Sequence, residues 1–172
     1  MQRFGVFLRA VNVGGTGKLP MTDLRDICAE CGFENIKTYI ASGNVALNSA
    51  LAPREIAARL EEALQGYAGK PAGVFVRSHA ELTAIAAENP FADAAGNQVT
   101  TILLNEDPEG AIAKGAKGQN DELIQAGTDV IYVHYPSGMG TSKLKLLGVE
   151  QGTARNMNTI AKMVALTAQV FR

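Results

Sequence analysis

Cationic, amide and hydroxyl side chains gather in a few segments of the 172-residue sequence that contain almost no acids. An arginine guanidinium can hold a carboxylate or phosphate through two parallel hydrogen bonds, and a lysine adds a point charge. Asparagine amides both donate and accept hydrogen bonds. We expect these side chains to converge on one basic, amide-rich cleft that binds an anionic, nucleotide-like small molecule bearing a phosphate or a carboxylate. The residues of this predicted site are Arg9, Asn12, Lys18, Tyr39, Ser42, Asn44, Ser142, Lys143, Arg155 and Asn156.

The distribution of charge along the chain favours a positive patch. Residues 1–22 hold three basic residues and no acid, and residues 35–54 hold two basic residues and no acid. Residues 130–172 hold five basic residues and one acid, Glu150. The rest of the chain is acidic, so the formal net charge is only −1. A patch forms if the three segments meet in space. In the alternative interpretation the asparagines cap helices and occupy turns, and the cations are solvated.

Two short motifs are typical of other sites but fit them poorly. Residues 13–18 resemble a P-loop, yet Asn12 stands where a P-loop has its first glycine, and Leu19 where it has a magnesium-binding hydroxyl. We interpret this loop as a connector, or as a set of backbone donors for an anion. Cys28 and Cys31 form a C-x-x-C motif at the C-terminal end of a predicted helix, where the helix dipole opposes thiolate formation. We interpret them as two core thiols.

Catalytic chemistry has little support in these segments. Acid–base and metal catalysis need carboxylates or histidines, and Glu150 is the single acid of the basic segments. His79 and His134 lack the paired spacing of a metal site, so we expect no metal and no cofactor. Ser142 is expected to cap a short helix rather than to form a dyad with Lys143, because adjacent helical residues face apart. An enzyme that acts on an anionic substrate and an interaction module without a small ligand both stay open as alternatives.

Nucleic acid is a less favoured partner than a small molecule. Some α+β sheets bind RNA by stacking bases on aromatic side chains. The first predicted sheet has a few aromatic residues but lacks the sequence signature of such RNA-binding sheets. These residues are Phe4, Phe7, Tyr39 and Phe75.

The elements that must position these residues follow an α+β pattern. Strands are predicted at residues 3–9, 35–40, 43–48 and 73–77, from their apolar and alternating runs. Helices are predicted at 20–31 and 53–66, each with a proline in its first turn. The order β-α-β-β-α-β is typical of a ferredoxin-like unit, which we assign to residues 1–77.

The second half, residues 78–172, is predicted to form a smaller α+β unit packed against the first. Ser78 and Glu81 make a capping box that starts a helix, and Asp107 caps a shorter one. The other predicted elements are a strand at 99–104, a hairpin of 122–126 with 130–135, a short helix near 142–147 and a last helix at 157–170.

Longer motifs resemble a known family over nearly the whole chain. The segments that carry the resemblance are 8–15, Met21, 38–45, 81–91, 142–144 and 153–159. On these segments the chain resembles the bacterial "domain of unknown function 1697" family. It departs from the family pattern at Ala10, where Gly is common, and at Met157, where a Trp is usual. The family has no assigned function, so the resemblance implies a fold and not a reaction.

The composition is that of a folded globular protein, with 47% hydrophobic and 19% charged residues. Two cysteines are too few for a disulfide framework and favour a reducing compartment. Arg9 interrupts the apolar run near the N-terminus, and no stretch is long enough for a membrane span. We therefore expect a cytoplasmic protein without membrane contact. The sequence does not indicate an oligomeric state.

Overall fold

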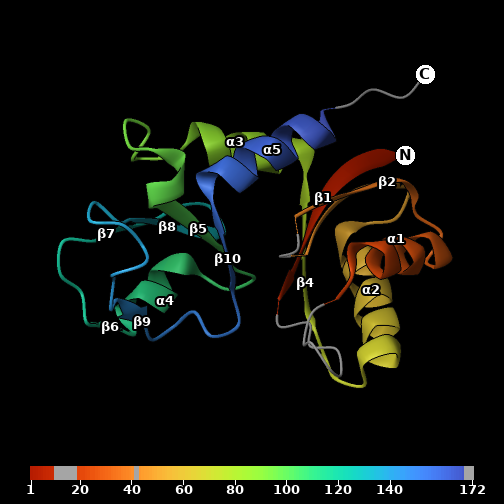
Figure 1. The fold of residues 1–172 in the computed structure, drawn as a ribbon, viewed down its shortest axis with the longest axis horizontal. Coiled ribbons are helices and arrows are strands. Elements are labelled where there is room, and N and C mark those ends of the chain that lie inside the picture. The colour runs from red at the N-terminus through yellow and green to blue at the C-terminus, as the bar shows by residue number, and fades with distance from the viewer. Residues whose placement is uncertain (10–18, 41–42, 169–172) are drawn as a thin grey trace. The chain divides into compact units, whose positions relative to one another are not determined.

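The chain has a mixed α+β fold, as predicted, in a computed structural model that describes residues 1–9, 19–40 and 43–168. Clustering of residue contacts divides it into two compact units. The first unit is Met1–Leu82 with Met163–Arg172, and the second unit is Thr83–Lys162 (Figure 1). Two helices, α3 (His79–Ala87) and α5 (Met157–Thr167), contribute residues to both units.

The first unit contains a four-stranded antiparallel sheet. Its strands are β1 (Gln2–Arg9), β2 (Glu34–Tyr39), β3 (Asn44–Ser49) and β4 (Gly73–Ser78), in the order β2-β3-β1-β4. Helix α1 (Met21–Glu30) joins β1 to β2, and α2 (Pro53–Ala68) joins β3 to β4. These elements match the predicted strands and helices to within two residues at each end.

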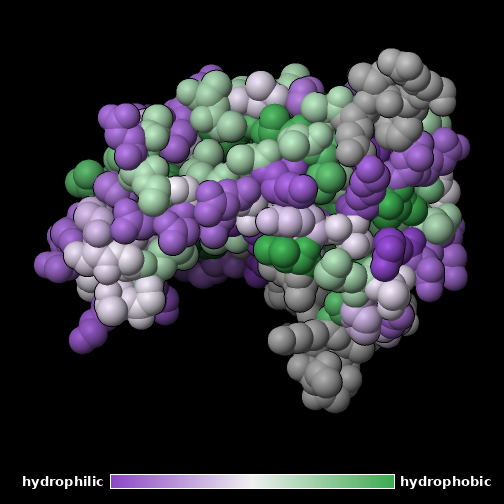
Figure 2. All heavy atoms as spheres, turned by 45° about the horizontal axis from the view of Figure 1, so that its top comes forward, coloured by the Kyte–Doolittle hydropathy of each residue, from purple (hydrophilic) through white to green (hydrophobic). Residues whose placement is uncertain are grey.

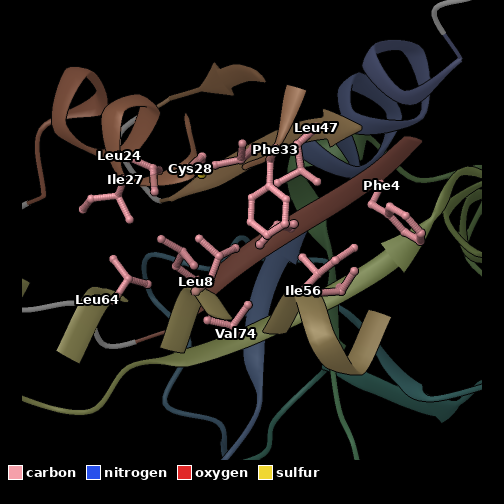
Figure 3. Close-up of a cluster of buried hydrophobic side chains, with 14 residues drawn as sticks. Phe4, Leu8, Leu24, Ile27, Cys28, Phe33, Leu47, Ile56, Leu64 and Val74 are labelled. Atoms are coloured by element: carbon pink, nitrogen blue, oxygen red, sulfur yellow. The ribbon is translucent and has the colours of Figure 1, made fainter. Parts of the chain in front are cut away.

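Helices α1 and α2 cover one face of this sheet with a hydrophobic core (Figure 3). Leu8 and Val74, paired across β1 and β4, point toward Leu24 of α1 and Leu64 of α2. Cys28 belongs to the same core and is fully buried. The alternation of strand side chains therefore places every second residue of β1 against the helices, as its apolar pattern predicts.

The opposite face of the first sheet is covered in part by the start of α3 and the end of α5. A Cβ added to Gly5 would lie 2.7 Å from Leu82 Cδ1 and 3.4 Å from Met163 Cε. Gly5 therefore allows both helices to approach β1 closely. His79 and Thr167 join the same two helices, because the His79 Nδ1 lies 2.9 Å from the Thr167 hydroxyl.

Arg3 on β1 links three other segments of the first unit. Its guanidinium donates to the Leu166 carbonyl of α5 at 2.6 Å, to the Asn35 carbonyl at 3.0 Å and to the Asn48 side chain at 3.0 Å. The side chain is 8% exposed, and burial lowers the pKa of Arg3. Leu166 lies in the last turn of α5, where free carbonyls and the helix dipole favour a cation.

The second unit contains a second antiparallel sheet, in the order β10-β5-β8-β7. Its strands are β5 (Val99–Leu103), β7 (Leu123–Ala126), β8 (Val130–His134) and β10 (Thr153–Asn156). Helix α4 (Pro108–Ala113) packs on one face, and the 3-10 turn η1 (Gly96–Gln98) precedes β5. The Tyr132 hydroxyl donates to the Ile85 carbonyl of α3 at 2.7 Å, so it serves packing rather than a polar site.

The predicted helix near residues 142–147 is wrong. Instead β9 (Lys145–Leu146) pairs with β6 (Ala116–Lys117) in a two-stranded sheet. The strand β10 was not predicted, and it pairs along β5. Both errors have one cause: pairing with distant residues satisfies the backbone groups of these short segments, and their local sequence carries no periodicity.

The predicted helix starts of the second half are confirmed. Ser78 accepts from the Glu81 backbone at 3.1 Å, and the Glu81 side chain accepts from the Ser78 backbone at 2.7 Å. Asp107 accepts from the Gly110 backbone at 3.1 Å and so caps α4. These contacts are local in sequence, which is why they could be predicted.

Hydrophilic residues are spread over the face shown in Figure 2, between smaller hydrophobic groups. Large hydrophobic side chains that are more than 40% exposed are few among the described residues: Met1, Ile40, Tyr67, Leu123 and Met139. Among the helices that the structure describes, none is long and apolar enough to cross a membrane.

We expect Arg3→Ala to destabilise the protein by about 3 kcal/mol, because it removes three charge-assisted hydrogen bonds and leaves their acceptors unsatisfied. The free energy of unfolding in urea measures this loss. Arg25→Ala on the exposed side of α1 is the matched control and should change stability by about 0.5 kcal/mol or less. Equal effects of the two substitutions would contradict the linking role of Arg3.

The two cysteine thiols are expected to react slowly in the folded protein. Burial, and secondly the charge of Cys31, raise the pKa of Cys28 to about 12. Burial also raises the pKa of Cys31, which is partly exposed. Iodoacetamide labelling near neutral pH should modify Cys31 before Cys28, and unfolding in guanidinium chloride should equalise their rates. Rapid labelling of Cys28 in the native protein would mean that it is not a core thiol.

Candidate functional site

Three predicted site residues lie on the face of the first sheet that points away from α1 and α2. The strand register aligns Tyr39 with Asn44, Asn44 with Phe7, and Phe7 with Phe75, so these four side chains form one row across all four strands. Arg9 follows Phe7 by two residues on β1 and shares this face. Arg9, Tyr39 and Asn44 are therefore on one surface. Asn12, Lys18 and Ser42, and the whole P-loop-like segment 13–18, lie outside the described residues.

The charges of this sheet face are mostly positive. The next row holds Lys37 and Arg77 at its two ends, and Arg3 follows on β1. The register places one acid, Glu34, opposite Asn48 on the same face. Arg3 and Arg77 are buried, whereas Arg9 is half-buried and Lys37 is exposed. Solvent therefore reaches the basic end of this face at Arg9, Lys37 and Tyr39.

Close packing of glycine backbone positions Arg9. A Cβ added to Gly73 would lie 3.1 Å from Arg9 Nε and 3.2 Å from Arg9 Cβ. The Arg9 side chain therefore crosses the start of β4 at the one position of that strand that has no side chain. A larger residue at position 73 would displace the guanidinium.

The hairpin between β2 and β3 carries a strained residue beside these groups. Ile40 has φ +48°, a left-handed conformation that is rare for a β-branched residue, and its side chain is 45% exposed. Such strain persists only where the surrounding structure imposes it, and it is common at ligand sites. Gly43, with φ +81°, accepts a hydrogen bond from the Leu8 backbone at 2.9 Å, which fixes the hairpin to the end of β1.

Asn44 has a structural role in the same hairpin. Its side chain is fully buried, and its amide donates to the Tyr39 carbonyl at 3.0 Å. This contact closes the hairpin from inside. Asn156 likewise caps a helix, because its side-chain oxygen accepts from the Thr159 backbone in the first turn of α5 at 3.0 Å. The alternative interpretation from the sequence, that asparagines serve caps and turns, applies to both residues.

Arg155 on β10 contacts its own strand. Its guanidinium donates to the Thr153 hydroxyl at 2.7 Å and to the Ala154 carbonyl at 2.9 Å. The side chain is 8% exposed, and burial lowers the pKa of Arg155 to about 10, so it stays cationic at neutral pH. These contacts hold the guanidinium close to the backbone of the edge strand.

Ser142 and Lys143 line a pocket of about 270 Å³ within the second unit. Neither Arg155 nor Asn156 is among its lining residues. Glu122, which the sequence analysis did not select, is the buried acid of this pocket, with 4% of its surface exposed. Its side-chain partner Ser142 is 20 residues away in sequence, so no local motif could have identified this pair.

Hydrogen bonds hold the Glu122 carboxylate in its ionised form. The Ser142 hydroxyl donates to Oε1 at 2.6 Å, and the Asn120 backbone donates to Oε2 at 2.6 Å. The Ser142 bond and then the backbone bonds lower the pKa of Glu122. A lowered pKa makes a carboxylate a weaker general base.

Within residues 1–9, 19–40 and 43–168, no group of three or more histidine, cysteine, aspartate or glutamate side chains could hold a metal ion. His134 packs against Phe91, with ring centroids 5.3 Å apart.

We expect the stability of the second unit to depend on pH through Glu122. A lowered folded-state pKa means that the ionised carboxylate stabilises the fold above the usual glutamate pKa of about 4.3. This contribution is lost as the pH falls through the lower folded-state pKa. Ser142→Ala removes the largest cause of the shift, so its unfolding free energy in urea should fall less than that of the wild type between about pH 7 and about pH 3.

Thr141→Ala is the matched control for this experiment, because the Thr141 hydroxyl donates to the Ser137 carbonyl and not to a carboxylate. It should lower stability without changing the pH dependence. A Ser142→Ala curve parallel to that of the wild type would contradict the role assigned to the hydrogen bond.

A family model matches this chain in sequence, and a solved structure resembles it in fold. No curated protein matches its sequence. The fold is similar to the structure of the conserved bacterial protein SP0830 from Streptococcus pneumoniae, with a TM-score of 0.79 and 22% sequence identity over 96% of this chain and 98% of that chain. The profile of the family described as "Protein of unknown function (DUF1697)" matches residues 1–132. The chain belongs to the DUF1697 family.

Proposed function

We propose that the protein binds an anionic small molecule at the corner of the first sheet where β1 ends and the β2–β3 hairpin turns. The observation that carries this proposal is the shared face of Arg9, Tyr39 and Lys37, on which the register places four cations and one acid. The chain as a whole has a net charge of −1, so this concentration of positive charge is local. A local positive field attracts a phosphate or carboxylate and raises its encounter rate.

The chemistry of the corner suits a phosphate or carboxylate group. A half-buried guanidinium gives two parallel donors, and partial burial strengthens them relative to water. Lys37 is exposed and adds a positive charge, and Tyr39 brings a phenol hydroxyl to the same face. The strain at Ile40 supports the same location, since strained backbone is concentrated at ligand sites.

A base-stacking mode of binding is disfavoured. Phe7 and Phe75 occupy the centre of the row beside Asn44, but they are 0% and 3% exposed. Bases stack only on rings that are accessible. The ligand that we propose therefore interacts through its charge, and nucleic acid stays the less favoured class.

We also propose that the first half of the chain has the ferredoxin-like arrangement of strands and helices. The sheet order β2-β3-β1-β4, with α1 and α2 on one face, supports a ferredoxin-like unit, for which we keep the bounds 1–77, followed by a second α+β unit at 78–172. Two unpaired thiols support a reducing, cytoplasmic location.

Arg9→Gln tests the proposed site. Wild-type protein should bind one of a set of nucleotides, sugar phosphates and tricarboxylates, which raises its melting temperature by mass action. Arg9→Gln should weaken that binding about tenfold or more, since a charge-assisted hydrogen bond contributes about 1.5–3 kcal/mol. Isothermal titration calorimetry measures both dissociation constants.

Arg25→Gln is the control, because Arg25 is an exposed cation on α1, away from this sheet face. It should bind the ligand as the wild type does. The proposal fails if no anion in the set binds at millimolar concentration, or if the two variants lose affinity equally.

A further inference from the structure

A polar pocket lies within the second unit, and its lining shares no residue with the proposed anion site. It has a volume of about 270 Å³ and is formed by the segment before β7 and the loop that follows β8. Its lining residues are Gly118, Asn120, Asp121, Glu122, Ser137, Gly138, Thr141, Ser142 and Lys143. Apart from the two glycines, every lining residue has a polar or charged side chain.

The hydroxyl groups of the pocket already donate hydrogen bonds to other groups of the protein. Ser142 donates to the Glu122 carboxylate, and Ser137 donates to the Asp121 carboxylate. Thr141 donates to the Ser137 carbonyl at 3.2 Å. A hydroxyl has one proton and two acceptor lone pairs, so these three groups offer a ligand only acceptors. Ionised carboxylates are acceptors as well.

The charge of the lining favours a cation. Asp121 and Glu122 are two carboxylates, and Lys143 is the one cation among the lining residues. The pocket therefore has a formal charge of −1. A ligand with one positive charge and several N–H donors would neutralise it and fill its acceptors, whereas an anion would meet two carboxylates.

Both glycines of the pocket lining have positive φ angles, a backbone conformation that favours glycine. Gly118 has φ +70°, and a Cβ added there would lie 2.1 Å from the Lys143 carbonyl oxygen. The segment before β7 thus touches the segment that carries Lys143 through bare backbone. Gly138 has φ +88° and closes the turn on the opposite side.

We propose that this pocket binds a primary ammonium group at the end of a short carbon chain. The ammonium donates to the carboxylates of Asp121 and Glu122 and to hydroxyl oxygens, and a short carbon chain fills the remaining volume. The volume is below the usual range for drug-sized ligands, about 300–1,000 Å³, so the ligand has only a few carbon atoms. The ammonium comes either from a free amine or from the side chain of a lysine in a partner protein.

The test uses four probes with the full-length protein and follows backbone amide signals by NMR. The probes are 1-aminobutane, 1-butanol, butyrate and a lysine blocked at both its amino and carboxyl groups. We expect saturable shifts of residues 118–122 and 137–143 with one or both ammonium probes. The tighter of the two identifies the free-amine or the lysine source. Equal shifts with 1-butanol, or shifts with butyrate alone, would overturn the proposal.

Lys143→Gln gives the sharpest result, because Lys143 is the cation of the pocket lining and its loss should increase the affinity for a cationic ligand. Removing this cation should strengthen ammonium binding about threefold, as a like charge near the site is lost. Asp121→Asn should weaken it by a similar factor or more. Lys145→Gln on β9 is the matched control, exposed and outside the pocket, and should bind as the wild type does. Weaker ammonium binding by Lys143→Gln would overturn the proposal. Since none of these three variants changes Arg9, failure here leaves the anion site proposed for the first unit untouched.

Discussion

The buried guanidinium of Arg3 connects the first strand of the protein to its last helix. Its donors reach carbonyl or amide oxygens of α5, of the bulge in β2 and of β3, and the bond to Leu166 spans 163 residues of sequence. A guanidinium with acceptors on three segments restricts all of them at once, because its donors have a fixed planar geometry. The polar face of the first sheet, on which Arg9 and Tyr39 lie, keeps its register through this contact.

The acceptors of Arg3 explain why a buried charge is tolerated there. Leu166 lies in the last turn of α5, where carbonyl groups have no partner within the helix. Asn35 has φ +48° at the register shift of β2, so its carbonyl is turned out of the ladder. Both groups need a donor, and one arginine supplies it. Burial lowers the pKa of Arg3, and the three acceptors give its buried N–H groups hydrogen-bond partners.

Opposite charges organise the two units. In the first unit cations gather on one sheet face, and in the second unit the carboxylate of Glu122 ties the segment before β7 to Ser142. Because positive and negative charges cancel in the total, the net charge of −1 does not indicate either feature. They also divide the predicted site: Arg9 and Tyr39 share a positive surface, while Ser142 and Lys143 line a pocket with two carboxylates. Two binding sites for ligands of opposite charge are consistent with this division.

The sequence by itself determined the elements whose signals are local. The apolar spacing of β1, α1 and α2, the capping box of Ser78 and Glu81, and the Asp107 cap all depend on residues within a few positions of one another. The family could also be identified from contiguous motifs. Arg9 and Tyr39 were selected from the sequence as ligand-binding residues, and the strand register, which the sequence does not specify, places both on one sheet face.

Tertiary structure alone decided which oxygen or nitrogen each polar side chain meets. Arg3, for example, meets the carbonyl of Leu166, which is 163 residues away in the chain. The strands β9 and β10 and the partnership of Ser142 with Glu122 depend on contacts between residues far apart in the chain. The local sequence specifies what a side chain can donate or accept, but the partner is chosen by long-range packing, which residue type and spacing do not encode.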